Sequence, residues 1–281
     1  MGIGHRRERV DEDEVLAVVQ LPLQLFARDL VEPRGHVVSV RALDLASRRE
    51  RLRSLHLPGK PLVLPNAWDA ASARAVVAAG FPVVATTSAG VANALGYDDH
   101  EDAPAEEMFA AAARIVRAVD VPVTVDSEAG YGLEPAAVVA ALRDVGAAGC
   151  NLEDTDHETK TLREIDEHAA WLRRVREQDE TLVINARIDV FLTGDGDLDE
   201  ALRRARTYFH AGADCVYPIT LSDRGALQRF VTEAGGPVNV LANAGSVAEL
   251  GELGVARISH GALLYRQTIE QFARSLNALS G

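Results

Sequence analysis

The sequence predicts an α/β protein folded as a (β/α)8 barrel, the TIM-barrel fold, over residues 41–281. Two observations lead to this prediction. From residue 62 onward, short apolar runs alternate with amphipathic stretches, and eight such units fit into about 220 residues. Continuous apolar strands that alternate with helices form parallel sheets covered on both faces, and eight units are enough to close a barrel.

An open, doubly wound sheet is the alternative interpretation of the same alternation. Its dinucleotide-binding form carries a G-x-G-x-x-G turn directly after the first strand. No such turn follows residues 62–68. We therefore prefer the barrel.

The eight strands are the apolar, β-branched runs of the repeat. Between them the chain is rich in alanine and keeps the spacing of amphipathic helices, for example over residues 104–119, 135–146 and 198–212. Several of these stretches end in glycine, a common cap residue at helix C-termini. The expected strands are residues 62–68, 82–88, 121–128, 149–154, 181–189, 214–220, 237–243 and 256–261.

Two segments precede the repeat. Residues 41–57 read as a helix, which we expect to cap the start of the barrel. Residues 1–40 do not join the repeat, and we expect them to form an N-terminal extension of low order.

Composition excludes several classes of partner. The net charge of -13 argues against binding to nucleic acid or to an anionic membrane. No apolar run is long enough to span a bilayer. The two cysteines, Cys150 and Cys215, lie in apolar strand-like runs without a zinc-spaced partner. We read them as buried thiols and expect a cytoplasmic protein.

Polar side chains gather where three of the predicted strands end. Side chains alternate between the two faces of a strand, so one face of each strand can be followed by counting every second residue. On this count, three strands turn polar groups toward the barrel axis, at the end where TIM barrels carry their active sites. These groups are Thr124, Asp126 and Glu128, then Asn151 and Glu153, then Asn185, Arg187 and Asp189.

Three of these acids, Asp126, Glu128 and Glu153, would repel one another strongly if their carboxylates converged in the barrel mouth. A bound divalent cation removes this repulsion, and oxygen ligands favour Mg²⁺ or Mn²⁺ over zinc. Arg187 beside them would suit an anionic oxygen of a substrate. Simpler interpretations remain open. Asp126 and Glu128 can be solvated loop acids, Glu153 and Asp154 can be acids at a helix N-terminus, and Arg187 can be an ion-pair partner only.

Five motifs at the strand ends carry a resemblance to a known family. They are LPNAWDAASARAVVAAGF, TTSAGVANALGYDD, VDSEAGYG, NLED and INARID, in this order along the chain. The chain resembles the isocitrate lyase/phosphoenolpyruvate mutase superfamily over roughly residues 45–265. The resemblance implies a TIM-barrel enzyme that uses Mg²⁺, with Mn²⁺ as an alternative, on a small 2-oxo acid or its precursor. Members make or break a C–C or P–C bond next to an enolate.

The resemblance also implies roles for single residues. The family's substrate-carboxylate loop matches Ser88 and Ala89, its arginine matches Arg187, and an asparagine of its seventh strand matches Asn239. Its metal-site acids, several of which act through water, match Asp99, Asp126, Glu128 and Glu153.

The lid segment departs from the family pattern. Members that cleave isocitrate or methylisocitrate carry a lid cysteine as acid/base, whereas the corresponding EDTDHETKTLRE contains none. The same members carry a glutamate in the sixth strand, where this chain has Ile219. We therefore expect a C–C lyase of the oxaloacetate type, with water or His157 as the proton donor. The alternatives are a P–C bond enzyme (a phosphonomutase or phosphonopyruvate hydrolase) and a barrel that binds a 2-oxo acid without turnover.

The C-terminal stretch predicts self-association. The family's usual assembly is a tetramer that exchanges a C-terminal helix, so we expect a homo-oligomer, dimer or tetramer. Residues 261–279 are the candidate, because Leu264, Ile269, Phe272 and Leu276 lie near helical spacing. The alternative is that this stretch is the barrel's own eighth helix.

Overall fold

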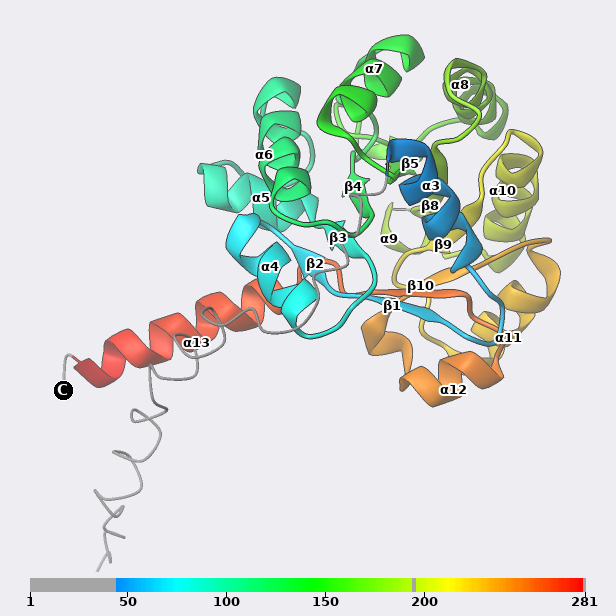
Figure 1. Cartoon of the computed structure of the whole chain (residues 1–281). Coiled ribbons are helices and arrows are strands. Elements are labelled where there is room, and N and C mark those ends of the chain that lie inside the picture. Colours follow the sequence, from blue (N-terminus) through cyan, green and yellow to red (C-terminus); the bar gives the residue numbers. More distant parts are fainter. Residues whose placement is uncertain (1–43, 194–195, 280–281) are drawn as a thin grey trace, which may run out of the picture. The chain divides into compact units, whose positions relative to one another are not determined.

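The computed structural model describes residues 44–193 and 196–279, and Figure 1 shows strands surrounded by helices. The predicted N-terminal extension, residues 1–40, lies outside the described residues. The parallel strands fall inside the predicted runs, although each is shorter than predicted. They are β1 (Leu62–Leu64), β2 (Asn66–Ala67), β3 (Val84–Thr86), β4 (Val123–Asp126), β5 (Gly149–Glu153), β8 (Val183–Ile188), β9 (Cys215–Pro218), β10 (Asn239–Leu241) and β11 (Arg257–Ser259).

The strands follow one another around a closed path. Six of them pair in the order β2-β3-β4-β5-β8-β9, and three pair in the order β1-β11-β10. A single bridge between Val216 and Val238 joins β9 to β10. At the other junction, β1 and β2 are two parts of one strand, interrupted at Pro65, which has no N–H to donate to a ladder. Within the described residues the sheet thus has eight strand positions, which confirms the predicted barrel.

Helices fill the connections between the strands. Helix α7 shows the local rules well: it begins with Pro135 in its first turn and ends at Gly146, whose φ of 79° is a left-handed conformation. The helices of the connections are α4 (Ala70–Ala78), α5 (Ser88–Leu95), α6 (Ala105–Arg117), α7 (Pro135–Val145), α8 (Ile165–Gln178), α9 (Val190–Thr193), α10 (Leu198–His210), α11 (Arg224–Glu233) and α12 (Val247–Glu252), with a 3-10 turn, η1 (Ala242–Ala244).

Helix α3 (Leu45–Ser54) confirms the predicted capping helix. Its Leu52 is fully buried against Leu62 and Val183, which lie at the starts of their strands. Two of its four arginines reach carboxylates that precede strands: Arg49 contacts Asp179 at 2.6 Å, and Arg53 contacts Asp214 at 2.7 Å. The helix therefore closes the amino-terminal end of the barrel, away from the strand ends that carry the predicted site.

Helix α13 (Leu263–Leu279) leaves the barrel instead of packing along it as an eighth helix (Figure 1). None of its residues is buried, and the side chains of Ile269, Phe272 and Leu276 are about half exposed or more. Only its first turns touch the barrel, where the rings of Tyr265 and Trp68 meet edge to face at 5.3 Å. Nothing in the described part of the chain is both long and apolar enough to cross a membrane as a helix.

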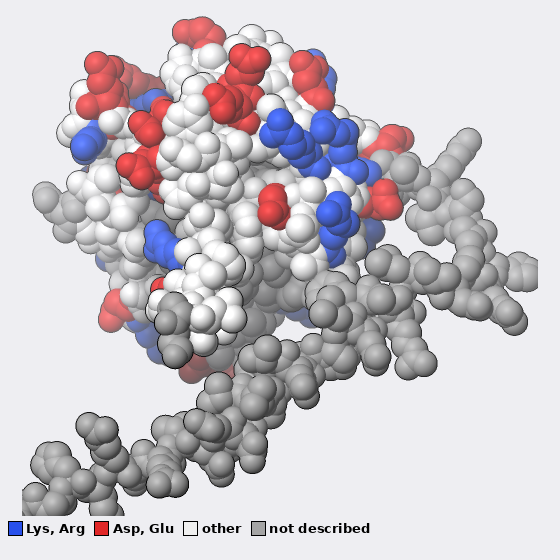
Figure 2. Space-filling view, turned by 90° about the vertical axis from the view of Figure 1, so that its left-hand side faces the viewer, with Lys and Arg blue, Asp and Glu red and all other residues white. Residues whose placement is uncertain are grey.

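Charges of both signs are present on the surface. On the face shown in Figure 2, basic and acidic side chains form small groups, and uncharged residues lie between the groups. This pattern is what the composition, 29 Lys and Arg against 42 Asp and Glu, leads one to expect.

Candidate active site

A cavity of about 810 Å³ opens where the strands end. This is a typical volume for a small-molecule site and is larger than a four-carbon acid needs. The segment 98–102, which follows α5, forms one wall, and Leu192 and Thr193 of α9 form another. A short hairpin forms the third wall: β6 (Thr155–Asp156) pairs with β7 (Thr161–Leu162), and its residues His157, Glu158 and Lys160 line the cavity. Arg187 and Asp189 form the floor.

Asp126 is held by two donors at the end of β4. The backbone N–H of Ser88 donates to Oδ2 at 3.1 Å, and the amide of Asn151 donates to Oδ1 at 3.2 Å. The orientation of Asn151 follows from its other contacts. Its Oδ1 accepts from Arg257 at 3.1 Å and from Asn185 at 2.8 Å. Since arginine can only donate, the oxygen of Asn151 must face Arg257, and its NH₂ group is left for Asp126.

Glu128 is a buried acid, with 3% of its surface exposed. One oxygen accepts the backbone N–H of Glu101 at 2.6 Å, and the other accepts the hydroxyl of Tyr131 at 3.1 Å. Burial, together with the negative charges of Asp126, Glu153 and Asp99, raises the pKa of Glu128 to about 8. Four carboxyl groups therefore share one region, and the solvated-loop interpretation of Asp126 and Glu128 is wrong.

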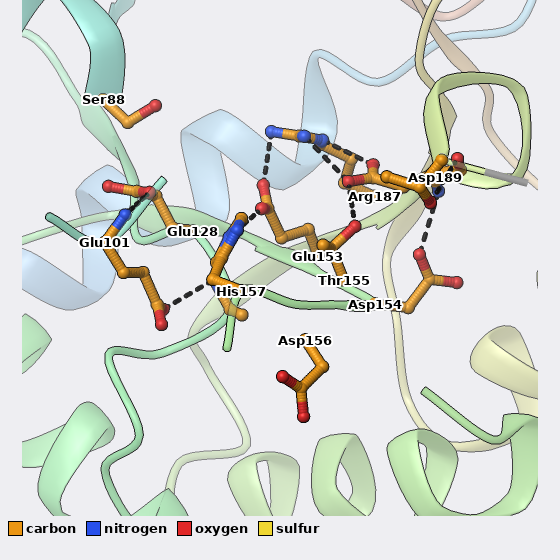
Figure 3. A network of polar contacts seen from close by, with 12 residues as sticks. Ser88, Glu101, Glu128, Glu153, Asp154, Thr155, Asp156, His157, Arg187 and Asp189 are labelled. Carbon is orange, nitrogen blue, oxygen red and sulfur yellow. Dashed lines mark hydrogen bonds and ion pairs between the residues drawn. The ribbon is translucent and has the colours of Figure 1, made fainter. Parts of the chain in front are cut away.

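Glu153 links an arginine to a histidine (Figure 3). It forms an ion pair with Arg187, and its other oxygen lies 2.6 Å from Nε2 of His157. Burial raises the pKa of Glu153, while the charge of Arg187 opposes this rise. Burial alone would lower the pKa of His157, but the contact with Glu153 raises it above its usual value. Glu153 ends β5 and is not at a helix N-terminus, so that alternative is also wrong.

Arg187 is gripped from two sides. Besides Glu153, it donates from Nε and Nη2 to the two oxygens of Asp189, at 2.6 and 2.8 Å. Asp189 is fully buried and also accepts the hydroxyl of Thr155 at 2.6 Å. Thr155 begins the hairpin, so the base of the hairpin is tied to the carboxylate that orients Arg187. Figure 3 shows this chain of contacts.

The donor set suits a hard cation bound largely through water. One oxygen of Asp99 is buried without a hydrogen-bond partner in the described structure, and the charges of Asp99, Asp126 and Glu153 all act on Glu128. Among residues 44–193 and 196–279, however, no three His, Cys, Asp or Glu side chains stand close enough to ligate one ion directly. Mg²⁺ commonly keeps several waters and takes only one or two carboxylates from the protein. The residues present therefore fit Mg²⁺ with a water-rich shell.

Three of the residues expected to bind substrate lie outside the cavity wall. Asn239 is fully buried at the first residue of β10 and donates to Ser259 at 3.1 Å. It begins its strand, whereas the cavity lies at the carboxyl ends of the strands. Ser88 and Ala89 begin α5 beside Asp126, and the N–H of Ser88 is already taken by that carboxylate.

Sequence reasoning missed other members of the site. Glu101, in the segment 98–102, makes three contacts with the loop after β4. Tyr217 is buried on β9, and its hydroxyl lies near Arg187, Asp126 and Arg257, whose charges act on it. The alternation of side chains could have found Tyr217, because Cys215 and Tyr217 pair with Asn185 and Arg187 on the neighbouring strand. No local pattern marks Glu101.

Comparison with known proteins identifies the family. The model of the phosphoenolpyruvate phosphomutase family matches residues 52–280. An uncharacterized protein of Mycobacterium tuberculosis is 36% identical over 228 residues, which are 80% of this chain and 87% of the relative. The oxaloacetate decarboxylase of Bradyrhizobium diazoefficiens is 31% identical over 204 residues, 68% of this chain and 70% of the relative.

A solved structure supports the same assignment. A candidate phosphonomutase from Burkholderia cenocepacia J2315 superimposes with a TM-score of 0.79 at 42% identity, covering 82% of this chain and 99% of that chain. These matches confirm the resemblance carried by the five motifs. The chain therefore belongs to the phosphoenolpyruvate phosphomutase family, within the isocitrate lyase/phosphoenolpyruvate mutase superfamily of lyases and phosphonomutases.

Proposed function

We propose that this enzyme is a Mg²⁺-dependent lyase that cleaves a C–C bond in a small 2-oxo acid of the oxaloacetate type. The observation that carries the proposal is the joint position of Arg187, Glu153 and His157 beside the acidic region formed by Asp99, Asp126 and Glu128. The relation to an oxaloacetate decarboxylase, at 31% identity, supports the substrate class.

The proposed reaction breaks the bond between C3 and C4 of the 2-oxo acid. Carbon dioxide leaves, the bonding electron pair becomes the enolate of pyruvate, and a proton is then added at C3. Asp126 and Asp99 would hold Mg²⁺, which would supply positive charge to offset the negative charge that develops on the substrate. Arg187 supplies a second positive charge at the floor of the cavity, where it stabilises the developing enolate.

His157 is the proposed proton donor. It lines the cavity, and its contact with Glu153 holds the ring in place and keeps it protonated at a higher pH than an isolated histidine. Asp189 accepts hydrogen bonds from both Thr155, at the base of the hairpin, and Arg187. These contacts fix the hairpin that carries His157 relative to Arg187.

A P–C bond enzyme is the second candidate. The observation that favours it is the 42% identity to a candidate phosphonomutase over nearly all of that chain. The same Arg187 and acidic region can hold a phosphonate as well as a carboxylate, because both are anions that chelate a divalent cation.

A product screen separates the two candidates. The purified protein with Mg²⁺ is given oxaloacetate and, separately, phosphonopyruvate. The lyase proposal predicts pyruvate from oxaloacetate above the rate with metal alone, and neither phosphate nor phosphoenolpyruvate from phosphonopyruvate. Turnover of phosphonopyruvate alone would establish the second candidate. Tight binding of either compound without product would contradict both.

We also propose that the protein assembles through α13. The apolar side chains Ile269, Phe272 and Leu276 recur at helical spacing, and the described part of the chain buries none of them. A second copy of the chain is the partner that the family's exchanged C-terminal helix suggests.

A further inference from the structure

Two loops at the cavity grip each other through their glutamates. The segment 98–102 follows α5, and residues 127–132 follow β4. The backbone N–H of Glu101 donates to a side-chain oxygen of Glu128 at 2.6 Å. In return, the carboxylate of Glu101 accepts the backbone N–H of Ala129 at 3.1 Å and that of Tyr131 at a shorter distance. We call these reciprocal contacts the Glu101–Glu128 clasp.

The backbone on both sides of the clasp is in a conformation that side chains disfavour. Glu101 has a φ of 61°, Glu128 of 47° and Tyr131 of 55°, all in the left-handed region. Such residues persist only where their surroundings hold them. In the loop 127–132, this geometry turns the N–H groups of Ala129 and Tyr131 toward one point, where an anion can accept both. The carboxylate of Glu101 occupies that point.

Each loop carries a carboxylate of the proposed metal region. Asp99 is two residues before Glu101, and Glu128 is itself half of the clasp. Asp126 is anchored separately, through Ser88 and Asn151, so it does not depend on these contacts. Of the three acids, Asp99 and Glu128 are therefore the two whose positions relative to each other are set by the clasp.

We propose that Glu101 is a positioning residue: its carboxylate folds the loop 127–132 against the segment 98–102 and so fixes Asp99 and Glu128 for a divalent cation. The role toward a cation rests on the proposed function, whereas the contacts of the Glu101–Glu128 clasp are independent of it. Glu101 acts through hydrogen-bond acceptance, so a neutral acceptor of the same shape should replace it.

The first experiment measures the clasp in metal-free protein. Hydrogen exchange followed by mass spectrometry compares the unaltered chain with Glu101→Gln and Glu101→Ala over residues 127–133. Glutamine keeps an oxygen for the two N–H groups, and alanine does not. We expect exchange to rise about tenfold or more in Glu101→Ala and less than about threefold in Glu101→Gln. Equal exchange in all three proteins would show that the clasp does not hold the loop.

The second experiment measures Mn²⁺ binding by electron paramagnetic resonance, without substrate. Both variants lose one negative charge, so a purely electrostatic role predicts equal weakening. The positioning role predicts that Glu101→Ala weakens Mn²⁺ binding about tenfold or more and that Glu101→Gln stays within about threefold of the unaltered protein. Glu158→Gln, which removes another acid of the cavity wall with no side-chain contact to either loop in the described structure, is the matched charge control.

The outcomes separate this inference from the proposed function. Equal weakening in the alanine and glutamine variants would overturn the positioning role. If the unaltered protein binds no Mn²⁺, the metal-dependent function and the role of Glu101 toward a cation both fail, and hydrogen exchange alone still decides whether the clasp exists.

Discussion

Arg187 shows how much one side chain does at the floor of the cavity. It satisfies Asp189 through two nitrogens and Glu153 through the third, and it still lines the cavity. Only a planar guanidinium with several donors can serve both carboxylates at once. The identity of this residue therefore matters beyond its positive charge.

Arg187→Lys tests this point. Lysine keeps the charge but cannot reach both Glu153 and Asp189, so the floor of the cavity loses its geometry. We expect kcat/KM for oxaloacetate to fall about 100-fold, the usual effect of removing one positioned donor from a site of this kind. The melting temperature of the variant is measured alongside. An unchanged kcat/KM in a folded variant would show that Arg187 is an ion-pair partner only.

His157→Gln tests the proton donor. Glutamine can keep a hydrogen bond to Glu153 but has no proton to give at neutral pH. We expect kcat to fall about 100-fold or more, within the range for loss of a general acid, while the affinity for oxalate as an inhibitor changes little. Full activity in this variant would assign the proton to water or to another group.

The sequence predicted these residues unevenly, for a physical reason. Asp126, Glu153 and Arg187 lie in strands, where side chains alternate between the two faces, so the sequence indicates which face each residue occupies. Asn239 is the first residue of its strand and does not line the cavity, because resemblance gave its strand but not its distance from the strand end; its role toward substrate stays a prediction. Glu101 and Arg257 act through contacts with residues far away in the chain, and no local pattern reports such contacts.

At the scale of elements, strands and helices were predictable because each repeats one pattern. The hairpin of β6 and β7 was not, since strands of two residues have no periodicity to detect. Yet this hairpin lines the cavity, and its Thr155 donates to Asp189. The element that the sequence described least thus forms part of the candidate site.

The docking of α3 onto the barrel predicts a pH dependence of stability. Burial alone would raise the pKa of Asp179, but hydrogen bonds from Thr181 and Arg49, together with the Arg49 charge, lower it to about 2. A carboxyl group whose pKa is lowered in the folded state stabilises the fold at pH values above its unfolded pKa, near 3.8. This contribution is lost as the pH falls from about 4 to 2.

Asp179→Asn should therefore lower the free energy of unfolding by about 2 kcal/mol at pH 7. The variant should also lack the part of the acid destabilisation that arises between pH 4 and pH 2. Urea unfolding at pH 7 and at several values between pH 5 and pH 2 measures both effects. Parallel pH curves for the two proteins would contradict the assigned role of Asp179.

At the scale of the whole molecule, α13 is the feature that one barrel leaves unexplained. A helix with its apolar side chains exposed gains stability only when another surface covers them. We expect the unaltered protein to be larger in solution than its chain mass of 30.2 kDa. Phe272→Glu should shift it toward the single chain, whereas Gln267→Glu, the same added charge at a polar position, should not. Size-exclusion chromatography with light scattering measures all three, and a monomeric unaltered protein would contradict the proposal.

The central claim belongs to the barrel as a whole, because strands from different parts of the chain end together. Arg187 and Asp99 line one cavity there, and the charges of Asp99, Asp126 and Glu153 act on Glu128. The most direct test is the release of pyruvate from oxaloacetate, measured with Mg²⁺, with Mg²⁺ and excess EDTA, and with Asp126→Ala, each against metal alone. We predict release above the metal background for the unaltered protein only, and its loss both with EDTA and in a folded Asp126→Ala. Release that survives EDTA, or that Asp126→Ala retains in full, would contradict the account.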